Sequence, residues 1–214
     1  SNDGTLLEGF KKNGFKVLGV EPTNIAKIAN RKGIKTIQRF FEKDTAKLIK
    51  KNYKKAEVIT GTNIFAHINK LDTLMKGVKS LLNIKNGIFV TESHYAVNIL
   101  DEMQFDSIYH EHLRFYLLKP LISLLNKYGF KVIDASRIPN YAGSIRVTAT
   151  LNKKIKPKKS VQQIINQEKK RGFYNQNKYN QYARKVKKVR KDLSEMLWKL
   201  KMKKKKNCRS WMSG

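Results

Sequence analysis

The sequence predicts an α/β fold built on a doubly wound parallel sheet. Short apolar strands alternate with helical patterns over the first ninety residues, which is the order that such a sheet requires. Polar residues fall at the carboxyl ends of three of these strands, at Glu21, residues 60–63 and Glu92. Sheets of this class bind ligands outside the carboxyl ends of their strands, so we expect the functional site at this edge.

Four strands and four helices are predicted in the first half of the chain. The strands are residues 15–20, 34–37, 56–60 and 87–91, and the helices are residues 5–13, 24–33, 44–50 and 71–81. The last of these helices has the clearest pattern, because its apolar residues recur at helical spacing. They are Leu71, Leu74, Met75, Val78 and Leu81.

An antiparallel strand pair is predicted further along the chain. Pro120 opens a helix that ends at Gly129. Residues 131–134 and 144–149 form two predicted strands. Because only a short link joins them, we expect them to pair antiparallel.

The C-terminal part is predicted to begin a second domain. A Lys-rich linker at residues 152–159 precedes a long amphipathic helix at residues 179–200, whose apolar stripe needs a partner. We therefore expect a first domain at residues 1–151, the helical start of a second domain at residues 152–206 and an unstructured tail at residues 207–214.

Composition excludes several classes of protein. The chain has 214 residues and one cysteine, Cys208, so neither a disulfide framework nor a cysteine-based zinc site is expected. No apolar run approaches the ~20 residues that span a bilayer, and no basic-then-apolar signal opens the chain. These features favour a cytoplasmic protein without a membrane partner.

The net charge of +30 is concentrated in the last 64 residues, which carry +19 of it. The basic residues are mostly lysines among Asn and Ile, and arginine, which contacts bases and phosphates bidentately, is scarce. We expect non-specific binding of polyanions at low salt but no specific nucleic-acid partner.

Residues 109–112 place two of the four histidines, a carboxylate and a phenol in consecutive positions. They lie on a predicted connection between elements, where catalytic groups are often found. A neutral imidazole beside a carboxylate is the usual composition of a general base near neutral pH. A hydrogen-bonded structural turn is equally compatible with this composition.

A metal site is a competing prediction for His110, Glu111 and His112. Two histidines two positions apart face the same way only in an extended segment. A third ligand would have to come from His94 or Asp106. No ligand spacing of the usual kind is present, so we expect no metal.

A loop of small residues opens the chain. Ser1, Asn2, Asp3 and Gly4 precede a predicted helix, whose first backbone N–H groups face the loop. Glu21 ends the next strand, where an acidic residue suits the two hydroxyls of a ribose. Asp3 would repel a pyrophosphate, and the glycine pattern of dinucleotide-binding loops is absent. S-adenosylmethionine, a cationic nucleoside without phosphates, fits better, although an ordinary loop and a solvated glutamate remain the alternative.

Together these motifs resemble those of S-adenosylmethionine-dependent sugar C-methyltransferases. They are SNDGTLL at 1–7, LGVEP at 18–22, GI at 33–34, NIFAHI at 63–68, QFDSIYHEH at 104–112 and GSIR at 143–146. The resemblance is close to about residue 150 and looser over 151–202. It implies a Rossmann-like class I methyltransferase fold, S-adenosylmethionine as cofactor and a nucleotide-linked 4-keto deoxysugar as substrate.

The resemblance also implies roles for individual residues. The cofactor-binding residues are Ser1, Asn2, Asp3, Gly4, Glu21 and Asn63. The catalytic residues are His112, Glu111, Tyr109 and His67, with His112 as the base. His112 would remove a proton next to the ketone, and Glu111 or Tyr109 would orient the sugar or stabilise the enolate oxygen. His94 and His110 receive no role.

The resemblance further implies that the chain is a fragment. The family has a first, central strand and a zinc module before Ser1, and a second Rossmann-like domain after Leu200, where we expect a truncation or frame shift. An O- or N-methyltransferase and an inactive basic fragment that binds polyanions are the alternative functions. The oligomeric state stays open.

Overall fold

The computed structural model describes the backbone of residues 1–202 and all of their side chains except that of residue 141. The helices are α1 (Thr5–Lys12), α2 (Ile25–Arg31), α3 (Lys43–Asn52), α4 (Leu71–Leu81), α5 (Ala96–Asp101), α6 (Leu118–Lys127), α7 (Lys159–Lys170) and α8 (Gln176–Met202), with short 3₁₀ helices η1 (Phe105–Ser107) and η2 (Asn140–Ala142). The strands are β1 (Gly19–Val20), β2 (Thr36–Ile37), β3 (Val58–Thr62), β4 (Ile88–His94), β5 (Lys131–Ile138) and β6 (Ser144–Thr150). The tail predicted at 207–214 lies outside the described residues.

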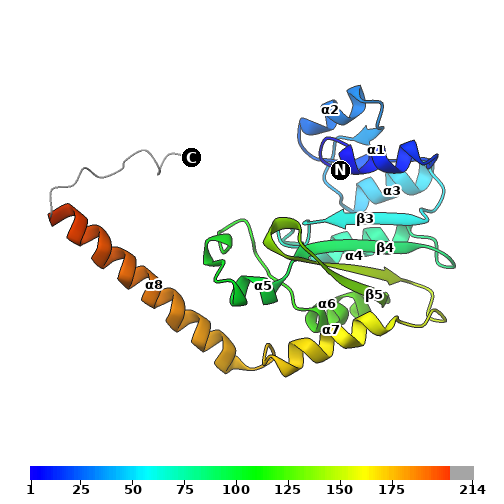
Figure 1. Ribbon diagram of the computed structural model, residues 1–214. Coiled ribbons are helices and arrows are strands. Elements are labelled where there is room, and N and C mark those ends of the chain that lie inside the picture. Colours follow the sequence, from blue (N-terminus) through cyan, green and yellow to red (C-terminus); the bar gives the residue numbers. More distant parts are fainter. Residues whose placement is uncertain (203–214) are drawn as a thin grey trace.

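The described strands form two sheets (Figure 1). In the smaller one, β1 pairs parallel with β2. The larger has the order β3-β4-β6-β5, in which β3 and β4 are parallel and the other two pairings are antiparallel. The α/β class and the antiparallel pair at the C-terminal end are thus confirmed. The strands β1 and β3 are not hydrogen-bonded neighbours, which agrees with the expectation that the first, central strand of the family's sheet is missing from this sequence.

The first two strands are shorter than predicted. Only Gly19 and Val20 pair with residues of β2, although a strand was expected from Phe15. The side chain of Phe15 is 60% exposed and packs edge-on against Phe10 instead. By contrast β4 extends to His94, beyond the predicted end at residue 91, because β3 pairs with it as far as Glu92 and β6 as far as His94.

One face of the larger sheet carries the main hydrophobic core. Helices α4, α6 and α7 cover this face (Figure 1). Its largest fully buried side chains include Phe65, Phe89, Phe130, Met75 and Leu121. Buried side chains of α7, among them Val161 and Ile164, belong to the same core, so this helix is an integral part of the folded unit.

Helix α6 begins two residues before the predicted start at Pro120. The backbone N–H of Leu118 donates to the carboxylate of Glu168, 2.6 Å away, and this bond satisfies one of the free amides at the helix N-terminus. The acceptor lies on α7, fifty positions away in sequence. No local pattern at residues 118–120 could have predicted it.

Helices α5 and α7 were not predicted, whereas the long helix α8 is confirmed. Helix α8 extends away from the sheets (Figure 1), and none of its residues is buried. The later part of its apolar stripe, for example Leu193 and Met196, is about half exposed. In the described part of the chain, no helix combines the length and the apolar character needed to cross a membrane.

Candidate functional site

The N-terminal loop has a backbone that favours glycine. Asn2 and Gly4 both have positive φ, 54° and 85°, a region that residues with side chains rarely adopt. A Cβ on Gly4 would lie 3.1 Å from Ile34 and 3.2 Å from Ala29. A Cβ on Gly19 would lie 2.4 Å from the Ser1 hydroxyl. Glycine at both positions therefore lets the loop pass close to β1 and β2.

Glu21 lies directly against this loop, as the sequence predicts. The backbone N–H of Asn2 donates to Oε2 of Glu21 at 2.9 Å. The hydroxyl and the backbone N–H of Thr23 donate to Oε1 at 2.8 Å and 3.1 Å. Burial raises the pKa of Glu21, but these hydrogen bonds more than offset it, so the pKa is lowered overall. A carboxylate thus stays ionised beside the loop.

Asp3 is a second ionised carboxylate in the same loop. The ammonium of Lys32 donates to its Oδ2 at 2.7 Å, and the hydroxyl and backbone N–H of Thr5 donate to Oδ1 at 2.8 Å and 3.1 Å. The bond from Lys32 is the main cause that lowers the pKa of Asp3 to about 2, with the bonds from Thr5 next. Asp3 is therefore ionised at neutral pH, and its charge is paired with that of Lys32.

Asn63 follows β3 directly and also has a positive φ, of 54°. Its backbone N–H donates to the carbonyl of Glu92 at 2.8 Å, which holds the chain against β4 where β3 ends. The side chain of Glu92 is buried and accepts two bonds from the Arg146 guanidinium, at 3.2 Å and 3.0 Å. Asn63 is thus fixed at the carboxyl edge of the sheet, where ligands are expected.

His112 is held through both of its ring nitrogens. Nδ1 lies 3.0 Å from the carbonyl oxygen of Ser107, and Nε2 lies 3.0 Å from the hydroxyl of Tyr109. A carbonyl oxygen can only accept, so the proton of the neutral ring must be on Nδ1. The single lone pair of Nε2 then accepts from the Tyr109 hydroxyl, and it can act as a base once that hydroxyl turns away.

Three further rings surround His112. The ring centroids of His67, His94 and Phe115 lie 4.9 Å, 5.6 Å and 5.6 Å from that of His112. We call His67, His94, Tyr109, His112 and Phe115 the histidine cluster. Three of these residues, His67, Tyr109 and His112, are predicted as catalytic from the sequence, whereas His94 has no predicted role.

Backbone contacts explain why distant segments meet in the cluster. The backbone N–H of Leu113 donates to the carbonyl of Ala66 at 2.9 Å. The guanidinium of Arg114 donates to the carbonyls of Ile68 and Asn69 at 2.6 Å and 3.2 Å. These bonds place the segment after His112 against the segment that carries His67.

The structure does not bring Glu111 into the histidine cluster. Its side chain is 63% exposed, and its Oε1 lies 4.0 Å from Nε2 of His110, whose side chain is 90% exposed. Both therefore face solvent, and a catalytic role for Glu111 stays a prediction. Within residues 1–202, no group of three or more His, Cys, Asp or Glu side chains is arranged to hold a metal ion.

Sequence reasoning missed Ser107 and Phe115 and could give His94 no role. Ser107 acts through its backbone carbonyl, which every residue has, so no residue type marks it. His94 ends β4 at the expected edge of the sheet, and this position is the signal that could have assigned it to the site.

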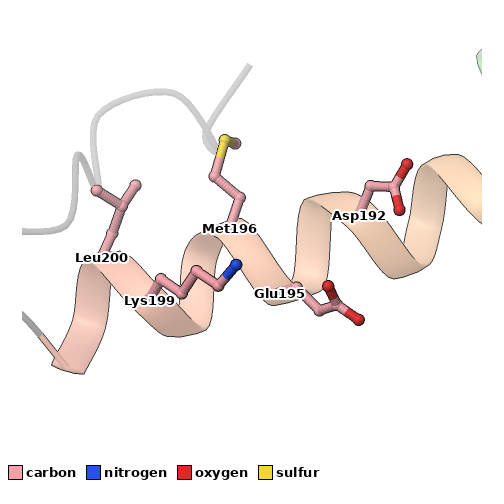
Figure 2. Close-up of a pocket in the computed structure, with 5 residues that line it drawn as sticks. All are labelled: Asp192, Glu195, Met196, Lys199 and Leu200. Atoms are coloured by element: carbon pink, nitrogen blue, oxygen red, sulfur yellow. The ribbon is translucent and has the colours of Figure 1, made fainter.

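A shallow hollow near the end of α8 contains none of the predicted site residues. It is lined by Asp192, Glu195, Met196, Lys199 and Leu200, and Figure 2 shows all five side chains projecting from this one helix. A feature formed by one exposed helix does not gather groups from several elements, as the histidine cluster does.

Comparison with known proteins agrees with the fold. A family model described as a methyltransferase domain matches residues 1–135, and one described as the C-methyltransferase C-terminal domain matches residues 139–208. The C-methyltransferase NovU of Streptomyces niveus is 31% identical over 201 residues, which are 92% of this chain and 47% of NovU. The chain thus spans about half the length of this curated relative. The domain boundary predicted at residue 151 stays a prediction.

Solved structures share the fold at low sequence identity. An S-adenosylmethionine-dependent methyltransferase from Archaeoglobus fulgidus has a TM-score of 0.53 at 15% identity, covering 69% of this chain and 81% of that one. One from Anabaena variabilis has a TM-score of 0.52 at 16% identity, covering 70% and 73%. The magnesium protoporphyrin IX methyltransferase of Synechocystis, solved with bound SAH, has a TM-score of 0.52 at 12% identity, covering 69% of each chain. From the family model over residues 1–135 and this fold, the chain belongs to the methyltransferase domain family, and its residues 139–208 are similar to the C-methyltransferase C-terminal domain.

Proposed function

We propose that this chain binds S-adenosylmethionine and carries the catalytic residues for methylating a carbon next to the ketone of a nucleotide-linked 4-keto deoxysugar. The match to the C-methyltransferase C-terminal domain and the 31% identity to NovU support transfer to carbon. The sugar substrate rests on the motifs described above. The chain spans 47% of NovU. The proposal therefore concerns the reaction that the residues of this chain could catalyse, and it is tested on this chain.

The N-terminal loop fits the proposed cofactor. Glu21 and Asp3 place two ionised carboxylates beside the N-terminus of α1, with Glu21 available to accept from ribose hydroxyls. The Asp3 carboxylate, which is paired with Lys32, is more compatible with a cationic nucleoside than with a pyrophosphate. S-adenosylmethionine, when bound, supplies an electrophilic methyl group for the carbon nucleophile. Gly4 and Asn63 would complete the cofactor-binding set.

His112 would generate that nucleophile. Its Nε2 takes a proton from the carbon next to the ketone; the C–H bond breaks and its electron pair forms the enolate. The resulting imidazolium keeps its Nδ1–H bond to the Ser107 carbonyl. The Tyr109 hydroxyl, 3.0 Å from Nε2, would turn to donate to the enolate oxygen, and His67 would orient the sugar.

One observation carries this proposal: the Ser107 carbonyl holds His112 in the tautomer whose Nε2 is unprotonated. Enolate formation needs such a base, whereas methylation of an oxygen or nitrogen does not require removal of a proton from carbon. A positioned general base contributes typically ~10²–10⁴-fold to a rate. The proposal thus predicts a reaction that can be followed without methyl transfer.

The test is exchange of the proton next to the ketone with D₂O, followed by proton NMR with S-adenosylhomocysteine present. The wild-type chain should exchange a nucleotide-linked 4-keto deoxysugar, and His112→Asn should slow the exchange about 100-fold or more. His110→Asn is the matched control, because this neighbouring histidine faces solvent and should leave the rate unchanged. Equal exchange by wild type and His112→Asn contradicts the assignment.

A wild-type chain that binds S-adenosylhomocysteine but exchanges no proton would favour an O- or N-methyltransferase instead. The exposed Lys- and Arg-rich face of α8 supports the other alternative, polyanion binding. Lysine contacts of that kind weaken steeply as salt rises. Specific nucleic-acid binding that persists in about 0.2 M salt would favour it over our proposal.

A further inference from the structure

Glu168 is a buried carboxylate that has no part in the reaction proposed for His112 and Tyr109. It lies on α7 and is 1% exposed. A carboxylate is costly to bury unless hydrogen bonds replace its water. Two bonds reach its Oε1, from the Tyr95 hydroxyl at 2.8 Å and from the backbone N–H of Leu118 at 2.6 Å. The hydroxyl of Tyr174 donates to its Oε2.

The two donors to Oε1 stand at the two ends of the catalytic segment, which we define as residues 96–117. Tyr95 directly precedes this segment, after β4, and Leu118 directly follows it as the first residue of α6. The segment contains Ser107, Tyr109 and His112. Its chain therefore enters and leaves past one oxygen atom of one carboxylate.

Backbone hydrogen bonding also joins the two ends of the catalytic segment. Tyr95 and Tyr116 form an isolated parallel bridge, and the backbone N–H of Ala96 donates to the carbonyl of Tyr116 at 3.0 Å. This single bridge brings the ends together but cannot fix the side chain of Tyr95. Glu168 adds bonds to a side chain at one end and to a backbone amide at the other.

The charge of Glu168 suits both donors. An anion is stabilised at a helix N-terminus, where Leu118 lies. Burial, together with the negative charge of Glu168, raises the pKa of Tyr95 and that of Tyr174. Both phenols therefore stay protonated and keep donating at physiological pH. Hydrogen bonds to an ionised acceptor are roughly twice as strong as neutral ones.

We propose that Glu168 is a positioning residue, which ties together both ends of the catalytic segment and thereby keeps His112 on the Ser107 carbonyl. Helix α7, which lies within the match to the C-methyltransferase C-terminal domain, would thus help to shape the active site. The consequence for catalysis rests on the function proposed above. The effect of Glu168 on the structure of the segment does not rest on that function, and it can be measured separately.

The test compares Glu168→Gln with the matched control Glu195→Gln, whose carboxylate lies on exposed α8. Hydrogen exchange of backbone amides and the ¹⁵N shifts of the His112 ring are measured on the whole chain. Glu168→Gln should speed exchange in residues 104–117 about 10-fold, leave β3 and α4 within 2-fold, and mix the two tautomers of His112; this magnitude corresponds to losing about 1.4 kcal/mol of local stability. Glu195→Gln should change none of these.

Uniformly faster exchange along the chain, or an unchanged tautomer of His112, would overturn the proposal, because Glu168 would then only stabilise the fold. Tyr95→Phe provides a second measurement if Glu168→Gln does not fold. It removes one donor and leaves the carboxylate, and it should speed exchange in the same residues about 3-fold; no local change would again overturn the proposal. If wild type fails to exchange the sugar proton while these readouts hold, the proposed function fails and the positioning role stands.

Discussion

The hydroxyl of Tyr109 lies 3.0 Å from Nε2 of His112, so the nitrogen proposed as the base is hydrogen-bonded to the phenol proposed to hold the enolate. Both residues lie on one irregular segment, three positions apart. The ring centroids are 4.2 Å apart, and the contact is direct. A substrate that delivers its proton to Nε2 must displace this hydroxyl, which then becomes free to donate to the substrate oxygen.

Tyr109→Phe should therefore slow exchange of the sugar proton. Removing one positioned donor to an oxyanion typically costs about 10²–10³-fold in rate, and we expect about 100-fold here. Cofactor binding should not change, because Tyr109 is not part of the N-terminal loop proposed to bind the cofactor. Proton NMR in D₂O measures the rate, and calorimetry with S-adenosylhomocysteine measures the binding.

Tyr53→Phe is the control for that substitution, since Tyr53 follows α3 and contacts Lys35 rather than the histidine cluster. It should retain the wild-type rate. A Tyr109→Phe variant as fast as Tyr53→Phe would mean that the phenol does not stabilise the enolate, and the donor would have to be sought elsewhere.

Glu21→Gln should weaken binding of S-adenosylhomocysteine. Hydrogen bonds to a charged group contribute about 1.5–3 kcal/mol, so we expect a loss of roughly 10- to 100-fold in affinity. The neutral amide also accepts more weakly from Asn2 and Thr23, which should loosen the loop. Calorimetry measures the dissociation constant directly.

Glu8→Gln serves as the matched change, because the Glu8 carboxylate lies on nearby α1 and pairs only with Lys12 at the surface. Its affinity should equal that of wild type. Equal weakening by both substitutions would point to a general effect of charge, and no weakening by Glu21→Gln would remove Glu21 from the cofactor site.

Sequence patterns predicted most elements whose signal is local. The spacing of apolar residues predicted α4 and α8, and the short link predicted the antiparallel pair of β5 and β6. Helix α7 was missed although Val161, Ile164 and Ile165 have helical spacing, because the Lys-rich residues before it suggested a linker. Strands β1 and β2 were predicted too long, since strand ends depend on partners that the sequence does not show.

The site could also be predicted only in part, because some of its residues belong to local motifs and others depend on contacts between distant segments. Motifs gave Glu21, His67, Tyr109 and His112, and the structure brings the last three together. Glu111 belongs to the same motif but faces solvent, because the backbone turn at residues 109–112 decides which side chains point inward. Glu168 is an isolated acid in a basic stretch of the sequence, and its two partners at Oε1 are 50 and 73 positions away. Only the fold shows such contacts.

The stability of the N-terminal loop should depend on pH through Asp3. Its pKa in the folded chain, about 2, lies below the ordinary value of 3.8. A carboxyl group with a lowered pKa stabilises the folded state above its ordinary pKa, and this contribution is lost as the pH falls toward the folded value. Asp3→Asn should thus lower the urea midpoint by a constant amount from pH 7 to about 5, and the difference should shrink progressively below that and vanish only below about pH 2.

Lys32→Met tests the cause of this effect. Lys32 supplies the main bond to Asp3, so in its absence the difference between Asp and Asn at position 3 should shrink at every pH. Urea unfolding at several pH values measures the stability of wild type, Asp3→Asn, Lys32→Met and the double variant. A difference that does not depend on pH would show that Asp3 acts through its shape and neutral hydrogen bonds rather than its charge.

Gly143→Ala should destabilise the fold through one close contact. Gly143 has a φ of 112°, and a Cβ there would lie 2.3 Å from Cγ of Asn98 on α5. Backbone strain and overpacking each cost about 1–3 kcal/mol, so we expect a loss of about 2–5 kcal/mol in the free energy of unfolding. Gly9→Ala is the opposite case, because Gly9 lies inside α1 with nothing within 4 Å of its added Cβ.

Gly9→Ala should stabilise the chain by about 0.5–1 kcal/mol, since alanine favours a helix interior over glycine. Urea unfolding of both variants measures the two free energies. The carbonyl of Gly143 also accepts the backbone N–H of Tyr95 at 3.2 Å, so displacing Gly143 should disturb the start of the catalytic segment as well. Hydrogen exchange in residues 104–117 should rise in Gly143→Ala beyond the change elsewhere; a purely global loss of stability would show that Gly143 does not anchor this segment.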